Sequence, residues 1–67
     1  MASPKYPHVH YPLTGKTAPP ALLVLQVWRL LQVGGVPAKR RAEFVREASA
    51  GDRDHTLDTI MAWVRVS

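Results

Sequence analysis

Apolar side chains follow helical spacing in three segments of this chain, and a proline-rich segment precedes them. The first helical segment, residues 20–33, is apolar at nearly every position. Its polar residues recur every three positions, at Gln26, Arg29 and Gln32. A helix that is apolar over most of its circumference must be covered on several sides. Gly34 and Gly35 follow, and glycine ends helices because it takes the left-handed conformation without steric cost. We therefore predict a first helix over residues 20–33 with Gly34 at its cap.

The second helical segment runs from Pro37 to about Ser49, and proline suits the first turn of a helix. Its small and apolar residues stand at Ala38, Ala42, Val45 and Ala48. We predict that these small residues face inward, with Phe44 to one side, so that the helix can approach its neighbour closely. Gly51 then ends the segment, and we predict a positive φ there because glycine adopts that conformation readily.

The third helical segment begins at Asp52, whose carboxylate can accept the free N–H groups of the first turn. Asp54 adds negative charge where the helix dipole is positive. An amphipathic stripe follows at Leu57, Ile60, Met61 and Val64. The pattern then changes to alternation over Trp63–Val66, which indicates a short terminal strand.

Residues 1–20 contain five of the six prolines, and proline excludes a regular helix there. Within this segment, His8–Tyr11 fits a short edge strand bounded by Pro7 and Pro12. Residues 14–16 read as a turn. Pairing of residues 9–13 with the terminal strand would tie the two ends of the chain together.

These elements predict a mainly α, small α+β fold with three short helices around one core. The domain organisation that we expect is a proline-rich N-terminal segment, residues 1–20, followed by a compact helical domain, residues 21–67. A chain of 67 residues without cysteine has no disulfide to stabilise it, so its core must be tightly packed or it must self-associate. The hydrophobic content of 46% is that of a folded domain.

The net charge of +4 favours approach to polyanions, although it is also an ordinary solubility charge for a small domain. Nothing near the N-terminus resembles a secretory signal. The longest apolar run, residues 21–33, contains polar residues and is too short to cross a bilayer. We therefore expect a cytoplasmic protein without membrane contact.

The second helical segment carries a basic cluster, formed by Lys39, Arg40, Arg41 and Arg46. Four cations on one helix can engage phosphates, which makes nucleic-acid binding one interpretation. Glu43 and Glu47 share the same helix, however, and the third helical segment begins with acidic residues. These acids favour the other interpretation, a solvated charged surface.

The three histidines offer fragments of sites rather than complete ones. His8 and His10 would lie on one face of a strand, which is half of a zinc site. His55 and Asp58 are three apart, so that the carboxylate could orient the imidazole. Nothing in the sequence supplies the remaining ligands or a nucleophile in a recognisable context. We expect no catalytic activity, no cofactor and no bound metal.

The residues from Ala50 to His55, followed by a helix and then Trp63–Val66, resemble a known family. It is a widespread group of very short phage and prophage proteins that end in Ser-Gly-Asp-Tyr-Asp-His-Leu-Leu, a helix and Trp-Val-x-Val. The chain departs from that pattern at Arg53, where an aromatic residue is usual, and at residues 16–20, where relatives carry an acidic loop. The resemblance implies a phage or prophage accessory protein in a bacterial host cell, with no catalytic residues.

Two functions follow from these observations. The first is a non-enzymatic protein-interaction module that binds a host factor or a second copy of itself. Its candidate contact residues are Trp28, Leu31 and Trp63, although tryptophan in so small a domain usually belongs to the core. The alternative is a small basic nucleic-acid-binding protein that uses the second-helix cluster.

Overall fold

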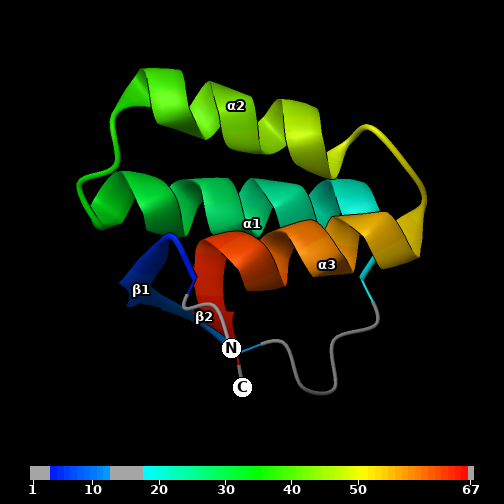
Figure 1. Ribbon diagram of the computed structural model, residues 1–67, viewed down its shortest axis with the longest axis horizontal. Helices are drawn as coiled ribbons and strands as arrows, with labels where there is room; N and C mark the ends of the chain where they lie inside the picture. Colours follow the sequence, from blue (N-terminus) through cyan, green and yellow to red (C-terminus); the bar gives the residue numbers. More distant parts are fainter. Residues whose placement is uncertain (1–3, 13–17, 67) are drawn as a thin grey trace.

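Three helices lie side by side in the computed structural model, and the two ends of the chain meet as a small sheet (Figure 1). The structure describes residues 4–12 and 18–66. The elements follow in the order β1 (Tyr6–Tyr11), α1 (Pro20–Val33), α2 (Ala38–Ala48), α3 (Arg53–Trp63) and β2 (Val64–Val66). The predicted small α+β fold is confirmed. No described helix is long and apolar enough to cross a membrane.

Both ends of α1 lie where the sequence predicted them. Pro20 is the first helical residue, and its missing N–H costs nothing there because the first turn has no intrahelical acceptor. At the other end, the Gly34 N–H donates to the Leu30 carbonyl at 2.9 Å. Gly35 follows with φ 85°, a conformation that a side chain would disfavour. The helix therefore ends in the two glycines, as predicted.

The junction between α2 and α3 confirms one prediction and corrects another. Asp52 is the N-cap of α3, and its carboxylate accepts the His55 N–H at 3.0 Å. The prediction of a positive φ at Gly51 is wrong, because Gly35 is the glycine at positive φ among the described residues. Gly51 is instead required by a close approach, since a Cβ there would lie 2.8 Å from the His55 Cβ.

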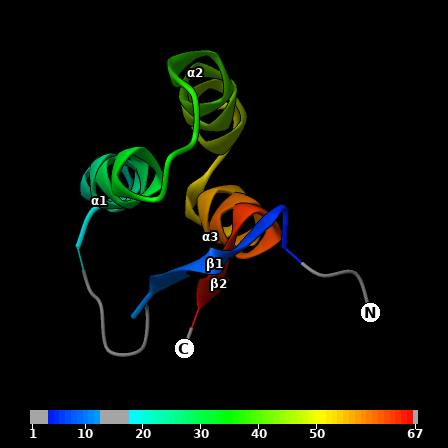
Figure 2. The same cartoon turned by 90° about the vertical axis from the view of Figure 1, so that its left-hand side faces the viewer.

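β1 and β2 pair in parallel, with Tyr6 opposite Val64 and Tyr11 opposite Val66. The predicted pairing of the terminal strands is thus confirmed, and all three helices form the connection between them (Figure 2). The predicted start of the first strand is wrong, because Pro7 lies inside β1. The ladder is irregular between Tyr6 and His10, and proline is tolerated at such a bulge because no ladder hydrogen bond is lost. The predicted turn at residues 14–16 lies outside the described residues.

The face that α2 turns toward the core differs from the predicted one. Phe44 and Ala48 are fully buried, whereas Ala38 and Ala42 are exposed. The Phe44 ring packs edge-on against Trp63, with 5.5 Å between ring centroids. An aromatic ring gains more from burial than two methyl groups do, so Phe44 sets the rotation of the helix.

The core face of α3 also differs in part from the amphipathic stripe that the sequence predicted. Met61, predicted to be inside, is 46% exposed, while Thr56 and Thr59 are buried. Each threonine hydroxyl donates to a backbone carbonyl: Thr56 to Ala48 at 2.8 Å, and Thr59 to His55 at 2.9 Å. Because their hydroxyl groups are satisfied, the two threonines can be buried at low cost.

Candidate functional site

A shallow apolar groove lies between α1 and α2, with a volume of about 310 Å³. Its lining residues are Ala21, Val24, Leu25, Trp28 and Val45. The groove exists because α1 is apolar around most of its circumference, and α2, α3 and β1 cover only part of it. We call this feature the α1–α2 groove.

Large apolar side chains continue from the groove onto the open surface of α1. Leu25, on the rim, is 49% exposed, and Leu22 beside it is 42% exposed. Single exposed apolar residues are common on protein surfaces and need no explanation. Here, however, they adjoin an apolar groove, and contiguous apolar surface is typical of a binding site.

Trp28 closes one part of the groove together with a cation from α2. The Arg41 guanidinium lies over the Trp28 ring, 4.6 Å from its centroid, and its Nε–H donates to the Val36 carbonyl at 3.2 Å. Arg41 therefore connects the α1–α2 turn to the groove, and its charge is held at the groove surface by a cation–π contact.

The three residues predicted to contact a partner do not lie together on the surface. Trp28 is half-buried and lines the groove, but Leu31 and Trp63 are fully buried. Trp63 packs between Tyr6, whose ring is stacked at 5.7 Å between centroids, and the edge of Phe44. Leu31 and Trp63 are thus core residues in this fold. Sequence reasoning missed Leu25 and Val45 as groove residues.

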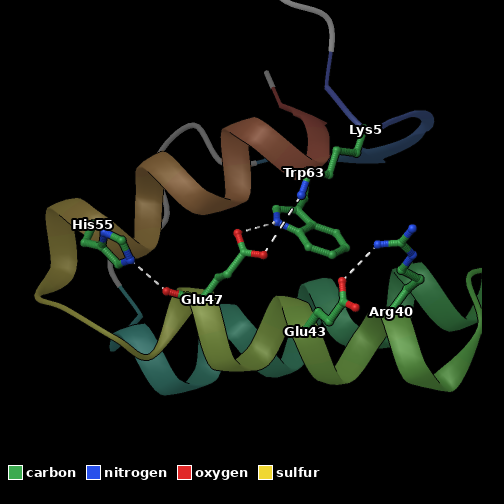
Figure 3. A network of polar contacts seen from close by, with 6 residues as sticks. All are labelled: Lys5, Arg40, Glu43, Glu47, His55 and Trp63. Carbon is green, nitrogen blue, oxygen red and sulfur yellow. Dashed lines mark hydrogen bonds and ion pairs between the residues drawn. The ribbon is translucent and has the colours of Figure 1, made fainter.

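A polar network surrounds Trp63 and joins α2, α3 and the segment before β1 (Figure 3). The indole Nε1–H donates to Glu47 Oε1 at 3.3 Å, and Lys5 Nζ lies 4.0 Å from the other carboxylate oxygen. The same ammonium group lies 4.3 Å from the Trp63 ring centroid. His55 Nε2 is 2.7 Å from the Glu47 carbonyl oxygen. Each of these polar groups contacts another part of the fold, so the network holds α2, α3 and the segment before β1 together.

The basic cluster of α2 is divided between structural contacts and open surface. Arg40 pairs with Glu43 at 3.0 Å, and Arg41 is held by Trp28 and Val36. Lys39 and Arg46 are exposed. All four cations therefore lie on one helix, as predicted. Arg40 and Arg41 make structural contacts there, whereas the other two cations are on the open surface.

The histidine fragments are engaged with backbone carbonyls. His8 Nε2 lies 3.1 Å from the Gly34 oxygen, and the His55 ring contacts Glu47 on α2 rather than Asp58 on its own helix. A second, more polar groove of about 550 Å³ lies beside the sheet and is lined by Pro7, His8, His10, Arg65 and Val66. Within residues 4–12 and 18–66, no three histidine, aspartate or glutamate side chains are grouped to hold a metal ion.

Tyr11 is a buried polar residue that the sequence did not single out. Its hydroxyl group donates to Gln26 Oε1, which joins β1 to α1. Burial raises the pKa of the Tyr11 phenol above its ordinary value of 10.0. The sequence did carry a signal for its burial. Val9 and Tyr11 are two residues apart, so they lie on the same face of the strand, and both are buried.

No protein-family model matches the chain, and comparisons with curated proteins and with solved structures give no significant match.

Proposed function

We propose that this chain is a non-enzymatic protein-interaction module whose α1–α2 groove binds a partner protein. The observation that carries the proposal is the continuous apolar surface formed by the groove and the exposed Leu22 and Leu25. Burying this surface against a partner would gain about 25 cal/mol for each Å² removed from water. The half-buried Trp28 would add a large rigid ring, the kind of residue that dominates binding energy at interfaces.

The resemblance to short phage and prophage proteins suggests where the chain would act. The chain would act as an accessory protein in the cytoplasm of a bacterial host, and its partner would be a host factor or a second copy of itself.

The proposal is tested by two matched substitutions on opposite helices. Leu25 and Met61 are 49% and 46% exposed, so both tolerate a polar residue, but Leu25 lines the groove and Met61 lies on α3. Tagged parent, Leu25→Asp and Met61→Asp proteins are incubated with host-cell lysate, with and without nuclease. We expect Leu25→Asp to lose the partners that the parent and Met61→Asp retain. Retention of every partner by Leu25→Asp would refute the groove as the binding site.

Nucleic-acid binding is the second candidate function. It is favoured by the exposure of Lys39 and Arg46, which lie only about 20° apart around the axis of α2. The nuclease arm separates the two functions, because partners held through nucleic acid are lost after digestion.

A further inference from the structure

Arginine residues surround the α1–α2 groove. Arg41 lies over Trp28 in the groove wall. Arg29 is four residues after Leu25, which places it about 40° around α1 from the groove rim. Arg46 follows Val45 and lies about 100° around α2, on the exposed side of that helix. An apolar floor thus has positive charge on both of its sides.

None of the residues that line the groove is acidic. The five acidic residues of the chain all occur between residues 43 and 58, so α1 carries none. Glu43 and Glu47 each lie about 160° around α2 from Val45. Figure 3 shows their side chains on the part of α2 that faces Trp63, where Glu43 pairs with Arg40 and Glu47 with Lys5. The carboxylates of α2 are therefore directed away from the groove, and their ion pairs are with Arg40 and Lys5 rather than with the arginines beside the groove.

The shape of the groove suits a helix. α1 and α2 run antiparallel beside each other in Figure 1, and Figure 2 shows all three helices nearly end-on. A further helix laid along the groove would pack as a neighbouring helix does in a bundle. Apart from Trp28, the lining side chains are aliphatic, so they fit aliphatic anchors at the i, i+3, i+4 and i+7 positions of an amphipathic helix.

Two other occupants fit the groove less well. A symmetric contact between two copies through this groove would place the arginines around one groove against the arginines around the other, and like charges oppose such an interface. A nucleic acid would use the positive charge and would need aromatic rings for stacking. One face of Trp28 is already covered by the Arg41 guanidinium, and the rest of the lining is aliphatic.

We infer that the α1–α2 groove binds an amphipathic helix of a partner protein with acidic residues flanking its apolar stripe. The inference rests on the proposed function and adds the chemistry of the partner. The aliphatic stripe fills the groove, and the flanking carboxylates pair with Arg29 on one side and Arg46 on the other. Arg41 keeps its cation–π contact with Trp28, and its positive charge attracts the partner's carboxylates at the groove wall.

The test uses two labelled synthetic helical peptides with the same leucine stripe, one flanked by glutamate and the other by lysine. Each is titrated into the full chain and followed by fluorescence anisotropy at low and at physiological salt. We expect the glutamate peptide to bind at least about tenfold more tightly at low salt, since several exposed ion pairs of modest strength add to that ratio. The preference should shrink as salt rises, because exposed charges are screened.

Matched variants of the chain locate the contacts. Arg29→Glu and Arg65→Glu change the net charge equally, but Arg65 lies on β2 beside the other groove. We expect Arg29→Glu to weaken the glutamate peptide several-fold more than Arg65→Glu does, and Arg29→Glu/Arg46→Glu to reverse the preference toward lysine. Leu25→Asp should abolish binding of both peptides, whereas Met61→Asp should not.

Several outcomes would overturn the inference. Equal affinity for the two peptides, both lost in Leu25→Asp, would leave the groove as a protein-binding site without selection for acidic partners. A preference for the lysine peptide, or no binding of either peptide, would also contradict it. Displacement of the peptide by an oligonucleotide would point to nucleic acid. A dimer in light scattering that dissociates in Leu25→Asp would identify a second copy as the occupant.

Discussion

The Trp63 indole on α3 and the Glu47 carboxylate on α2 are joined by a hydrogen bond of 3.3 Å. Trp63 is the largest of the fully buried side chains, and its ring nitrogen is its one polar atom. The bond therefore lets an aromatic ring fill the core without leaving its N–H unpaired. Lys5 lies near both groups, 4.0 Å from the carboxylate and 4.3 Å from the ring centroid.

Two substitutions at Glu47 separate the hydrogen bond from the ion pair. Glu47→Gln keeps an acceptor for the indole N–H and loses only the ion pair with Lys5. The side chains of that pair are exposed, Lys5 to 53% and Glu47 to 51%. An exposed pair contributes little, so we expect a loss of at most about 0.5 kcal/mol. Glu47→Ala removes the acceptor as well and should cost about 1 kcal/mol more. Urea unfolding of the three proteins measures the difference, and equal stability of the two variants would show that the indole bond contributes nothing.

We predict that the stability of the fold is sensitive to substitution of Gly51, because an added side chain would meet His55. An added Cβ would lie 2.8 Å from the His55 Cβ and 2.9 Å from its Cγ. The His55 ring cannot move freely, because Nε2 lies 2.7 Å from the Glu47 carbonyl oxygen. We expect Gly51→Ala to destabilise the fold by about 1–3 kcal/mol, in the range of overpacked sites.

The His55→Ala background is the control for this clash. It removes the ring atoms but keeps Cβ, so the cost of Gly51→Ala should fall without disappearing. An unchanged cost in the double-mutant cycle would show that the His55 ring is not what the glycine avoids.

Asp52 is expected to stabilise α3 through its side chain. Its Oδ1 accepts the His55 N–H at 3.0 Å, and no intrahelical acceptor replaces it in the first turn. Asp52→Ala should lower the free energy of unfolding by about 0.5–2 kcal/mol, and Asp52→Asn should lower it less because the amide oxygen still caps. Thermal unfolding of both variants tests this; an alanine variant as stable as the asparagine variant would contradict it.

The helix ends were predictable because their signals are local. Pro20, Gly35 and Asp52 each act through the backbone next to them, so their effect does not depend on what packs nearby. The rotation of α2 was not predictable in this way. Spacing allowed either the face of Ala38 or the face of Phe44 to be inside, and contact with Trp63, 19 residues further along, decides between them.

The groove was predictable only in part for the same reason. The apolar excess of α1 indicated that some of it would remain uncovered, as Leu22 and Leu25 show. Which part stays open depends on the rotation of α2, because that rotation places Val45 and Arg41 beside Trp28. Trp63 was assigned to a partner surface from its residue type, but its neighbours Tyr6 and Phe44 come from other elements.

Tyr11 should make the fold sensitive to high pH. Burial raises the pKa of its phenol above 10.0 in the folded chain, so the folded state retains this proton at a pH where the unfolded state has lost it. Stability from this group is therefore complete below pH 10 and falls as the pH rises above that value.

Tyr11→Phe isolates this effect. The variant should lose about 1 kcal/mol at neutral pH with its hydrogen bond to Gln26, but its stability should decline less steeply above pH 10. Urea unfolding at several pH values gives both slopes. Parallel slopes for parent and variant would show that the Tyr11 phenol is not the group responsible.

The basic residues of α2 should not form a nucleic-acid site that functions at physiological salt. Arg40 is paired with Glu43, and Arg41 is held by Trp28 and Val36, which leaves Lys39 and Arg46 as its exposed cations without such contacts among the described residues. Two phosphate contacts give weak binding with a shallow salt dependence, since each contact contributes about one unit to the slope. Attraction by net charge alone should disappear near physiological salt, where screening acts within about 8 Å.

Titration of duplex and single-stranded oligonucleotides at two salt concentrations tests this expectation. Lys39→Glu/Arg46→Glu is the suitable variant, because both residues are exposed and their loss leaves the Arg41 contacts intact. Arg65→Glu, an exposed cation on β2, is the control for net charge. We expect no submicromolar binding by the parent at physiological salt. Tight binding there that is lost in the double variant and kept in Arg65→Glu would instead make α2 a nucleic-acid-binding helix, because the loss would then follow the two α2 cations and not the net charge.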